Sequence, residues 1–227
     1  MATSGTTTYS LTAREVITYA LRKINMLAEN EDASASSAER ARIELNDMLK
    51  TWQRHASVWR LTEGSLTPVA NTASISLSTL RPYRILDCRY RNTSSIDLPM
   101  HEMTRQEYHR LPVKTTTGTP TNFYFDPQRD VGTLYIWPVL STVTTETIQT
   151  TYQRRFEDVT DLGETLDIAQ DAHETVKYNL AARLADDYGR KGEHISRVIQ
   201  RAEMLYQDML DADRPEVVRF VPERRAH

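Results

Sequence analysis

Hydrophobic positions near the start of the chain repeat at helical spacing. They form one apolar stripe that comprises Val16, Ile17, Ala20, Leu21, Ile24 and Leu27. Thr12 and Glu15 fit a capping box, in which each residue satisfies a free donor at the helix start. Leu11 and Val16 occupy the two positions of a hydrophobic staple. The pattern predicts a first helix over 12–27.

A second stripe of the same kind follows the polar stretch 28–36. Its members are Ala38, Ala41, Leu45, Met48, Leu49 and Trp52. Ser36 and Glu39 match a second capping box, and we expect this helix to end near His55. Two helices joined by a short link predict an antiparallel pair.

From Trp59 to about Phe156 the helical period is replaced by short alternating runs, which are typical of strands. We expect strands within 73–77, 84–92 and 147–155, a hairpin within 117–139, and an edge strand over 97–100, where Pro99 cannot donate to a ladder. Thr104 and Glu107 form a third capping box, which predicts a two-turn helix through Leu111. This region predicts an antiparallel β subdomain.

Helical periodicity returns after Leu166, in two further stripes. The first contains Ala172, Val176, Leu180, Leu184 and Tyr188, and Gly189 suits the left-handed position that follows a helix. The second contains Ile195, Val198, Ile199, Ala202, Leu205, Tyr206, Met209 and Leu210, and Pro215 ends it. The remaining residues, 214–227, have no helical period and read as an extended tail.

Together these patterns predict an α+β fold. Isolated helices of this length are marginal in water, so the four stripes should face one another. We expect an N-terminal helical pair (1–57), an inserted β subdomain (58–156) and a C-terminal helical pair (157–213). The two pairs would complete a four-helix bundle, with the extended C-terminal tail (214–227) beyond it.

The charge is unevenly distributed although the formal net charge is only −3. Residues 58–156 carry eleven basic and eight acidic residues, whereas 157–213 carry six basic and fourteen acidic ones. Such asymmetry suggests complementary contacts between copies or with partners, and differs from the strongly basic footprint of a DNA-binding protein. The sequence shows neither a long apolar run nor a signal peptide, so we expect no membrane contact.

Candidate chemistry is sparse. The six histidines lack zinc-protease spacing, and the seven glycines form no phosphate-binding loop. Residues 164–174 are acidic but lack the glycine and alternating ligands of a calcium loop. Cys88 lies in an expected strand, so a structural thiol is the favoured interpretation. We expect no catalytic residue, no cofactor-binding residue, no metal-binding residue and no enzyme activity.

The stretch TGTPTNFYFDPQRDVGTLYIWPV (117–139) is unusually aromatic, with five rings within 15 positions. Strand alternation places Phe123 and Phe125 on one face, Tyr124 on the other, and Tyr135 with Trp137 on one face. Three interpretations stay open: a β-subdomain core, a subunit interface, and, with RYRN (89–92), a base-stacking surface. The candidate contacts to another copy or to a partner protein are Tyr124, Tyr135 and Trp137.

The tail combines apolar with basic residues. Its apolar members are Val217, Val218, Phe220 and Val221, and its basic members include Arg219, Arg224 and Arg225. Four large apolar residues within five positions favour binding to a partner, for instance as an added strand.

The order of these segments resembles head-to-tail adaptor (connector) proteins of tailed bacteriophages. The resemblance is to the tail accessory factor, or packaged-DNA-stabilisation, group of short-tailed phages. It runs from about Leu11 to Leu210 and is carried, in order, by LTAREVITYALRKINML, LNDMLKTW, RPYRIL, QEYHRLPVK, GTPTNFYFDP, LYIWPV and YNLAARLADDYG. The segment Ile168–Asp171 departs from the group, in which a proline and an aromatic residue are expected.

The resemblance implies a structural protein of the virion that forms a ring, commonly of twelve copies, beneath the portal protein. It implies a channel for the double-stranded genome, a C-terminal segment that grips the portal, and a platform for a downstream tail or nozzle protein. Two alternatives remain: a virion-associated cell-wall hydrolase, which needs two apposed carboxylates in a cleft, and a small nucleic-acid-binding module, which predicts steep salt dependence.

Overall fold

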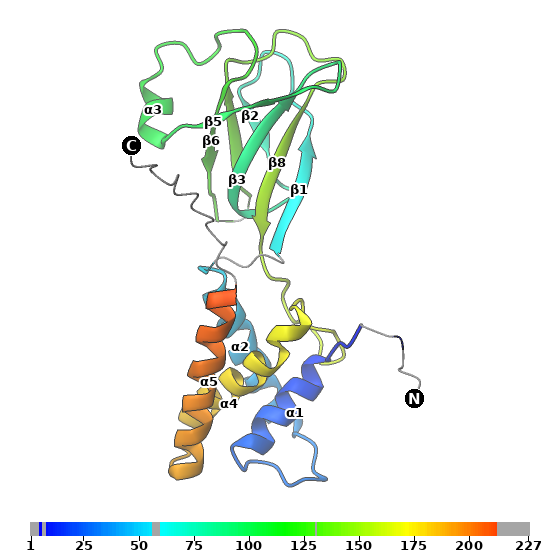
Figure 1. Cartoon of the computed structure of the whole chain (residues 1–227), viewed down its shortest axis with the longest axis vertical. Coiled ribbons are helices and arrows are strands. Elements are labelled where there is room, and N and C mark those ends of the chain that lie inside the picture. Colours follow the sequence, from blue (N-terminus) through cyan, green and yellow to red (C-terminus); the bar gives the residue numbers. More distant parts are fainter. Residues whose placement is uncertain (1–4, 6–7, 56–59, 130, 213–227) are drawn as a thin grey trace, which may run out of the picture. The chain divides into compact units, whose positions relative to one another are not determined.

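The computed structural model describes Gly5 and residues 8–55, 60–129 and 131–212 (Figure 1). The described residues form an α+β fold with five α-helices and two four-stranded sheets. The chain divides into two compact units. Residues 1–56 and 157–227 belong to the first, here called the helical unit, and residues 57–156 belong to the second, here called the β unit.

The helical unit is organised around one central helix. It contains α1 (Ala13–Lys23), α2 (Ala35–Trp52), α4 (His173–Asp187) and α5 (Glu193–Ala212), with a short 3-10 helix (Gln170–Ala172) before α4. α4 packs against α1, α2 and α5, so each expected stripe finds part of its cover on this helix. The fully buried side chains of this unit include Ile17, Leu21, Ile24, Leu45, Met48 and Leu49.

The helix ends show which capping predictions were right. At α1, the Glu15 backbone N–H donates to Thr12 Oγ1 (3.3 Å) and Glu15 Oε2 accepts from the Thr12 backbone N–H (2.8 Å), which confirms the first capping box. The expected box at Thr104 and Glu107 is also confirmed, at the start of α3 (Arg105–Arg110). Gly189 follows α4 with φ of 60°, as its left-handed position requires.

The predicted capping box at Ser36 and Glu39 is wrong. α2 begins two residues earlier, because Ser34 is the N-cap and its Oγ accepts from the Ser37 backbone N–H (3.2 Å). Glu39 instead accepts from Arg42, on the next turn, at 2.6 Å. The helix also ends at Trp52 rather than near His55.

The β unit contains two sheets. The first has the strand order β1 (Leu61–Leu66), β8 (Thr147–Arg154), β3 (Pro82–Arg91) and β4 (Asp97–Pro99). The second has the order β2 (Ser74–Ser76), β7 (Thr133–Trp137), β6 (Asn122–Asp126) and β5 (His101–Glu102). β5 pairs with β6 in parallel, so the expectation of a purely antiparallel subdomain is wrong at this edge. β4 lies at an edge, as Pro99 predicted.

One apolar core joins the two sheets. Its cluster includes Ile148, Tyr152, Cys88 and Tyr90 from the first sheet and Phe123, Leu134, Ile136 and Ile75 from the second. The hydrophobic pattern did not predict β1, because this strand contains Gly64 and few apolar residues. A Cβ at Gly64 would lie 2.9 Å from Leu80 Cδ1 and 3.0 Å from Tyr152 Cε1, so the glycine allows this close approach.

Candidate interaction surface

The described side chains include no group of metal ligands. Among residues 8–55, 60–129 and 131–212, no three His, Cys, Asp or Glu side chains come close enough to hold a metal ion. Cys88 is fully buried, and burial raises the pKa of its thiol, which keeps it protonated. Glu164, the first residue of the acidic stretch 164–174, accepts from the Thr160 backbone N–H and hydroxyl, both at 2.7 Å. Its pKa is lowered by these bonds.

No helix within the described ranges has both the length and the apolar character that a membrane span needs.

The aromatic hairpin divides its rings between two faces, as strand alternation predicted. Phe123 lies in the apolar core, and Phe125 packs against it. On the outer face, Tyr124 of β6 lies directly opposite Tyr135 of β7, with ring centres 5.8 Å apart and planes within 13°. Trp137 shares the face of Tyr135 and donates through its indole N–H to the Val113 carbonyl (3.2 Å).

A third ring, Tyr108 of α3, completes the cluster. Its centre lies 5.5 Å from that of Tyr124 and 4.9 Å from that of Tyr135. Tyr108 is only 4% exposed, and burial raises the pKa of its hydroxyl. The Lys114 ammonium lies 5.7 Å above the same ring, within the range of a cation–π contact. We call Tyr108, Tyr124 and Tyr135 the tyrosine cluster.

The tyrosine cluster changes the interpretation of the three candidate contact residues. Tyr124 is 7% exposed, because Tyr108 covers it within the same chain, whereas Tyr135 and Trp137 are half-buried. Beside Trp137, Val113 is 54% exposed. The accessible part of this surface is therefore the rim formed by Tyr135, Trp137 and Val113.

Sequence reasoning missed the contribution of Tyr108, although a signal for it was present. Tyr108 stands at the fourth helical position after the Thr104 cap, with Met103 just before the cap. These are the two positions of a hydrophobic staple, which points the helical residue inward.

The two arginines of RYRN lie on β3, in the first sheet, and are paired with carboxylates. Arg91 makes two bonds to Asp97, at 2.6 and 2.8 Å, which lower the pKa of that carboxyl group. Arg89 lies 3.2 Å from Glu63. Tyr90, between them, is buried in the apolar core. This arrangement favours the scaffold interpretation of RYRN over base stacking, which needs an exposed ring beside available cations.

The candidate tail residues lie outside the described part of the chain. These are Val217, Val218, Arg219, Phe220, Val221, Arg224 and Arg225. Their role as a portal-binding segment stays a prediction.

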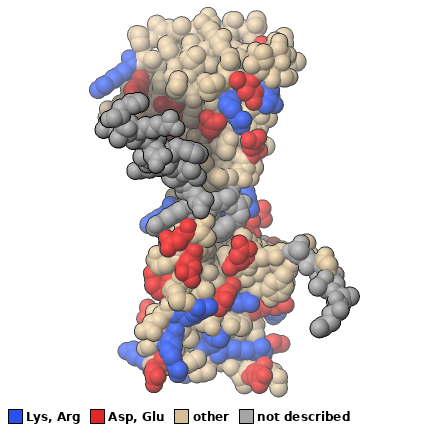
Figure 2. All heavy atoms as spheres, viewed as in Figure 1, with Lys and Arg blue, Asp and Glu red and all other residues tan. Residues whose placement is uncertain are grey.

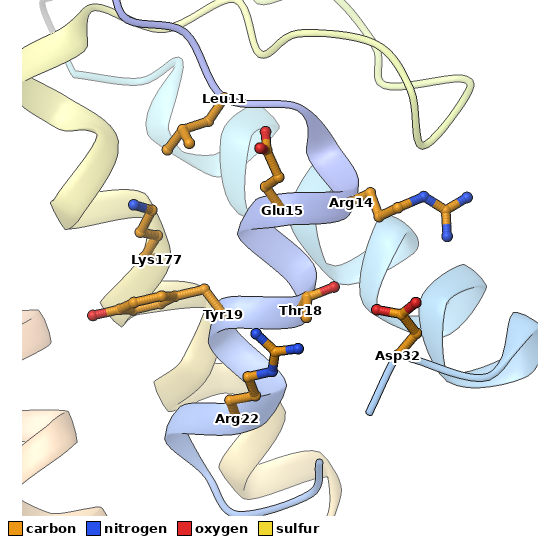
Figure 3. Close-up of a pocket in the computed structure, with 8 residues that line it drawn as sticks. All are labelled: Leu11, Arg14, Glu15, Thr18, Tyr19, Arg22, Asp32 and Lys177. Carbon is orange, nitrogen blue, oxygen red and sulfur yellow. The ribbon is translucent and has the colours of Figure 1, made fainter. Parts of the chain in front are cut away.

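A surface that the sequence did not single out lies on the outer face of α1 (Figure 3). It is a groove of about 370 Å³, here called the α1 groove, lined by Leu11, Arg14, Glu15, Thr18, Tyr19, Arg22, Asp32 and Lys177. Arg14, Thr18 and Arg22 follow one another at four-residue steps, which was the available signal for a continuous polar face. The groove gives the helical unit a basic, partly aromatic surface.

Comparisons with known proteins find similar chains among solved structures. No protein-family model and no curated protein matches the chain. Among solved structures, the chain is similar to one described as "Neck of empty GTA particle computed with C6 symmetry", at 11% identity and a TM-score of 0.30. The match covers 96% of this chain and 98% of the other. A TM-score of 0.30 does not establish a common fold, so this similarity carries no argument about function.

Proposed function

We propose that this chain is a structural head-to-tail adaptor of a tailed phage, with no enzymatic role. The observation that carries the proposal is the ordered resemblance of seven segments, from Leu11 to Leu210, to the tail accessory factor group. Each segment is short, and their common order and spacing make the resemblance specific. The protein would lie at the head–tail junction of the virion, after assembly in the host cytoplasm.

The proposed architecture follows the four segments expected from the sequence. The helical pairs 1–57 and 157–213 form a four-helix bundle, 58–156 is inserted as the β subdomain, and 214–227 is the extended tail. The packing of α4 against α1, α2 and α5 supports a bundle built from both ends of the chain.

In the proposed mechanism, copies dock on the portal protein after packaging and form a ring, commonly of twelve. The tail residues from Val217 to Arg225 bind the portal, with apolar side chains as anchors and arginines as additional donors. The ring extends the channel through which double-stranded DNA passes without sequence specificity, and it helps to retain the packaged genome. The β unit presents the platform for the downstream tail or nozzle protein.

The tyrosine cluster supports a scaffold role for the β unit. Three stacked rings attach α3 to the second sheet and leave the rim of Tyr135, Trp137 and Val113 accessible. Interface cores are enriched in tyrosine and tryptophan, so this rim is the proposed contact with another copy or with the next tail protein.

The test is reconstitution with the cognate portal. Purified full-length chain should form a ring on the portal, visible by electron microscopy, whereas a chain that lacks 214–227 should lose co-assembly. A matched variant, Arg219→Ala with Arg224→Ala and Arg225→Ala, separates the charges from the apolar residues. Circular dichroism should show that both variants keep the fold of the full-length chain. Absence of any ring with the full-length chain refutes the adaptor class, and undiminished binding by the truncated chain refutes only the role of the tail.

A further inference from the structure

α5 buries only a narrow part of its surface within the chain. Its buried side chains are Ile195, Val198 and Ala202, which form one stripe toward α4. The half-buried Tyr206 stacks on Trp52 of α2, with ring centres 5.2 Å apart. On the opposite side of the helix lies Met204, which is 47% exposed, followed by the exposed Asp208 and Asp211 at steps of one and two turns. We call these three residues the acidic face of α5.

The acidic face stands out in the space-filling view. Figure 2 shows carboxylates gathered over the C-terminal half of α5, with basic side chains nearer its N-terminal end. Glu203 is also exposed beside this face, and its carboxylate accepts from Gln207 at 2.8 Å. The exposed Arg201 lies one turn before Met204 and is paired with Glu174 at 3.2 Å. An exposed apolar side chain next to the two exposed carboxylates of this face suits a partner that supplies both cations and carbon surface.

The α1 groove has this complementary composition. Its cations are Arg14, Arg22 and Lys177, and its carboxylates are Glu15 and Asp32. The Glu15 carboxylate accepts two hydrogen bonds from Thr12 at the helix start, which lower its pKa and keep it ionised. The groove therefore presents three cations and two carboxylates, a small excess of positive charge.

The groove cations have different neighbours within the chain. Arg22 donates to the Glu31 backbone carbonyl (3.2 Å), which is a neutral acceptor. The Lys177 ammonium lies 4.9 Å from the Tyr19 ring centre, and its charge contributes to the lowered pKa of Glu15. Leu11 and Tyr19 add carbon surface to the lining of the groove (Figure 3).

Within one chain, α4 separates the two surfaces. It packs against α1 and against α5, and Figure 1 shows α1 and α5 on either side of it. The two outer helices meet at one end, where His194 Nε2 lies 2.8 Å from the Lys23 carbonyl oxygen. Their outer faces point away from each other, so α5 cannot fill the groove of its own chain.

We propose that the acidic face of α5 docks in the α1 groove of an adjacent copy. Met204 packs on Leu11 and Tyr19 of that copy, while Asp208 and Asp211 face Arg14 and Arg22. The contact joins two different surfaces, so each copy offers one surface to each neighbour, and repetition closes a ring when the rotation fits. The inference rests on the ring of the proposed function and specifies the contact that builds it.

Charge reversal on each side provides the test. The variant Arg14→Glu with Arg22→Glu alters the groove, the variant Asp208→Arg with Asp211→Arg alters α5, and the fourfold variant carries all four changes. Arg105→Glu with Arg110→Glu, on exposed positions of α3, is the matched control for two reversed arginines. Self-association is measured by sedimentation velocity and by imaging of rings with the portal.

We expect each twofold variant to associate at least tenfold more weakly than the original chain, and the fourfold variant to regain most of the association. The control should behave as the original chain does. Circular dichroism and urea unfolding check that every variant is folded.

Three outcomes of these assays overturn the proposal. Rings from the original chain with unaffected twofold variants refute this contact and leave the adaptor function standing. A folded fourfold variant that stays dissociated also refutes the pairing. If the original chain forms no ring at all, the proposed function and this contact fail together.

An alternative occupant of the acidic face is the chain's own segment 214–227. If that segment covers the face, its deletion should strengthen association through the groove, whereas the proposed contact predicts unchanged association between free copies. Stronger association after deletion assigns the face to the chain's own tail and overturns the proposal.

Discussion

Replacement of Tyr108 by alanine should destabilise the β unit where α3 packs on the second sheet. Tyr108 is 4% exposed, and its ring contacts those of Tyr124 and Tyr135. Truncation of a buried aromatic side chain costs about 3–5 kcal/mol, of which each aromatic pair contributes ~0.5–1.5 kcal/mol. Because α3 has only six residues and can settle toward the sheet, we expect a loss of about 2–4 kcal/mol in the free energy of unfolding of the β unit.

Hydrogen exchange with mass spectrometry localises this loss, because peptides from β6 and β7 report the β unit separately from the helical unit. Amides of these strands should exchange faster by about one and a half to three orders of magnitude, since ~1.4 kcal/mol corresponds to tenfold. Tyr108→Phe keeps the ring and should change exchange little. Tyr83→Ala, at a ring that is 36% exposed, is the matched surface control. If Tyr108→Ala and Tyr83→Ala have equal effects, the tyrosine cluster does not hold α3 to the sheet.

Two further predictions concern the helical unit. Ser34→Ala should lower its free energy of unfolding by about 1 kcal/mol through loss of the α2 cap, and Ser36→Ala by clearly less; equal losses in urea unfolding would contradict the assigned cap. Burial, followed by the Lys177 charge, lowers the pKa of His173, while Asp171 opposes them. The unfolded state then binds more protons, so stability should fall as the pH drops below about 6.5 toward the lowered folded value. Urea midpoints at pH 7.5 and 5.5 measure this slope; His173→Gln should reduce it, and an unchanged slope would show that another group titrates.

The helical part of the fold was readable from sequence because each helix carries its own local signals. The stripe of α1 and the Thr12 cap lie within a few residues of each other, so no distant contact is needed to place the helix start. The prediction extended α1 to Leu27, whereas the helix ends at Lys23 and Asn25 adopts φ of 56°. At the start of α2, Ser34, Ser36 and Ser37 are all possible N-caps. Which serine accepts the hydrogen bond depends on the path of the chain before the helix.

Strand pairing in the β unit was harder to predict from the sequence, because the strands that pair lie far apart along the chain. β1 pairs with β8, more than eighty residues later, and Thr150 Oγ1 donates to the Gly64 carbonyl at 3.2 Å. Nothing local in LTEGSL indicates this partner. The outer face of the hairpin was correctly divided from the inner one by alternation, but the cover that Tyr108 places over Tyr124 depends on how the chain returns after β5.

The two units therefore offer different kinds of surface to partners. In the β unit, Arg91 and Arg89 are already paired with carboxylates, and the accessible rim beside the tyrosine cluster is aromatic and apolar. In the helical unit, the α1 groove carries a net positive charge and the acidic face of α5 a net negative charge. Exposed charges act mainly on the rate and orientation of encounter and are screened by salt, whereas buried aromatic area slows dissociation. In the proposed ring, charged contacts between helical units would select the neighbour and its orientation, and the aromatic rim of the β unit would supply the slower-dissociating contact with the next component.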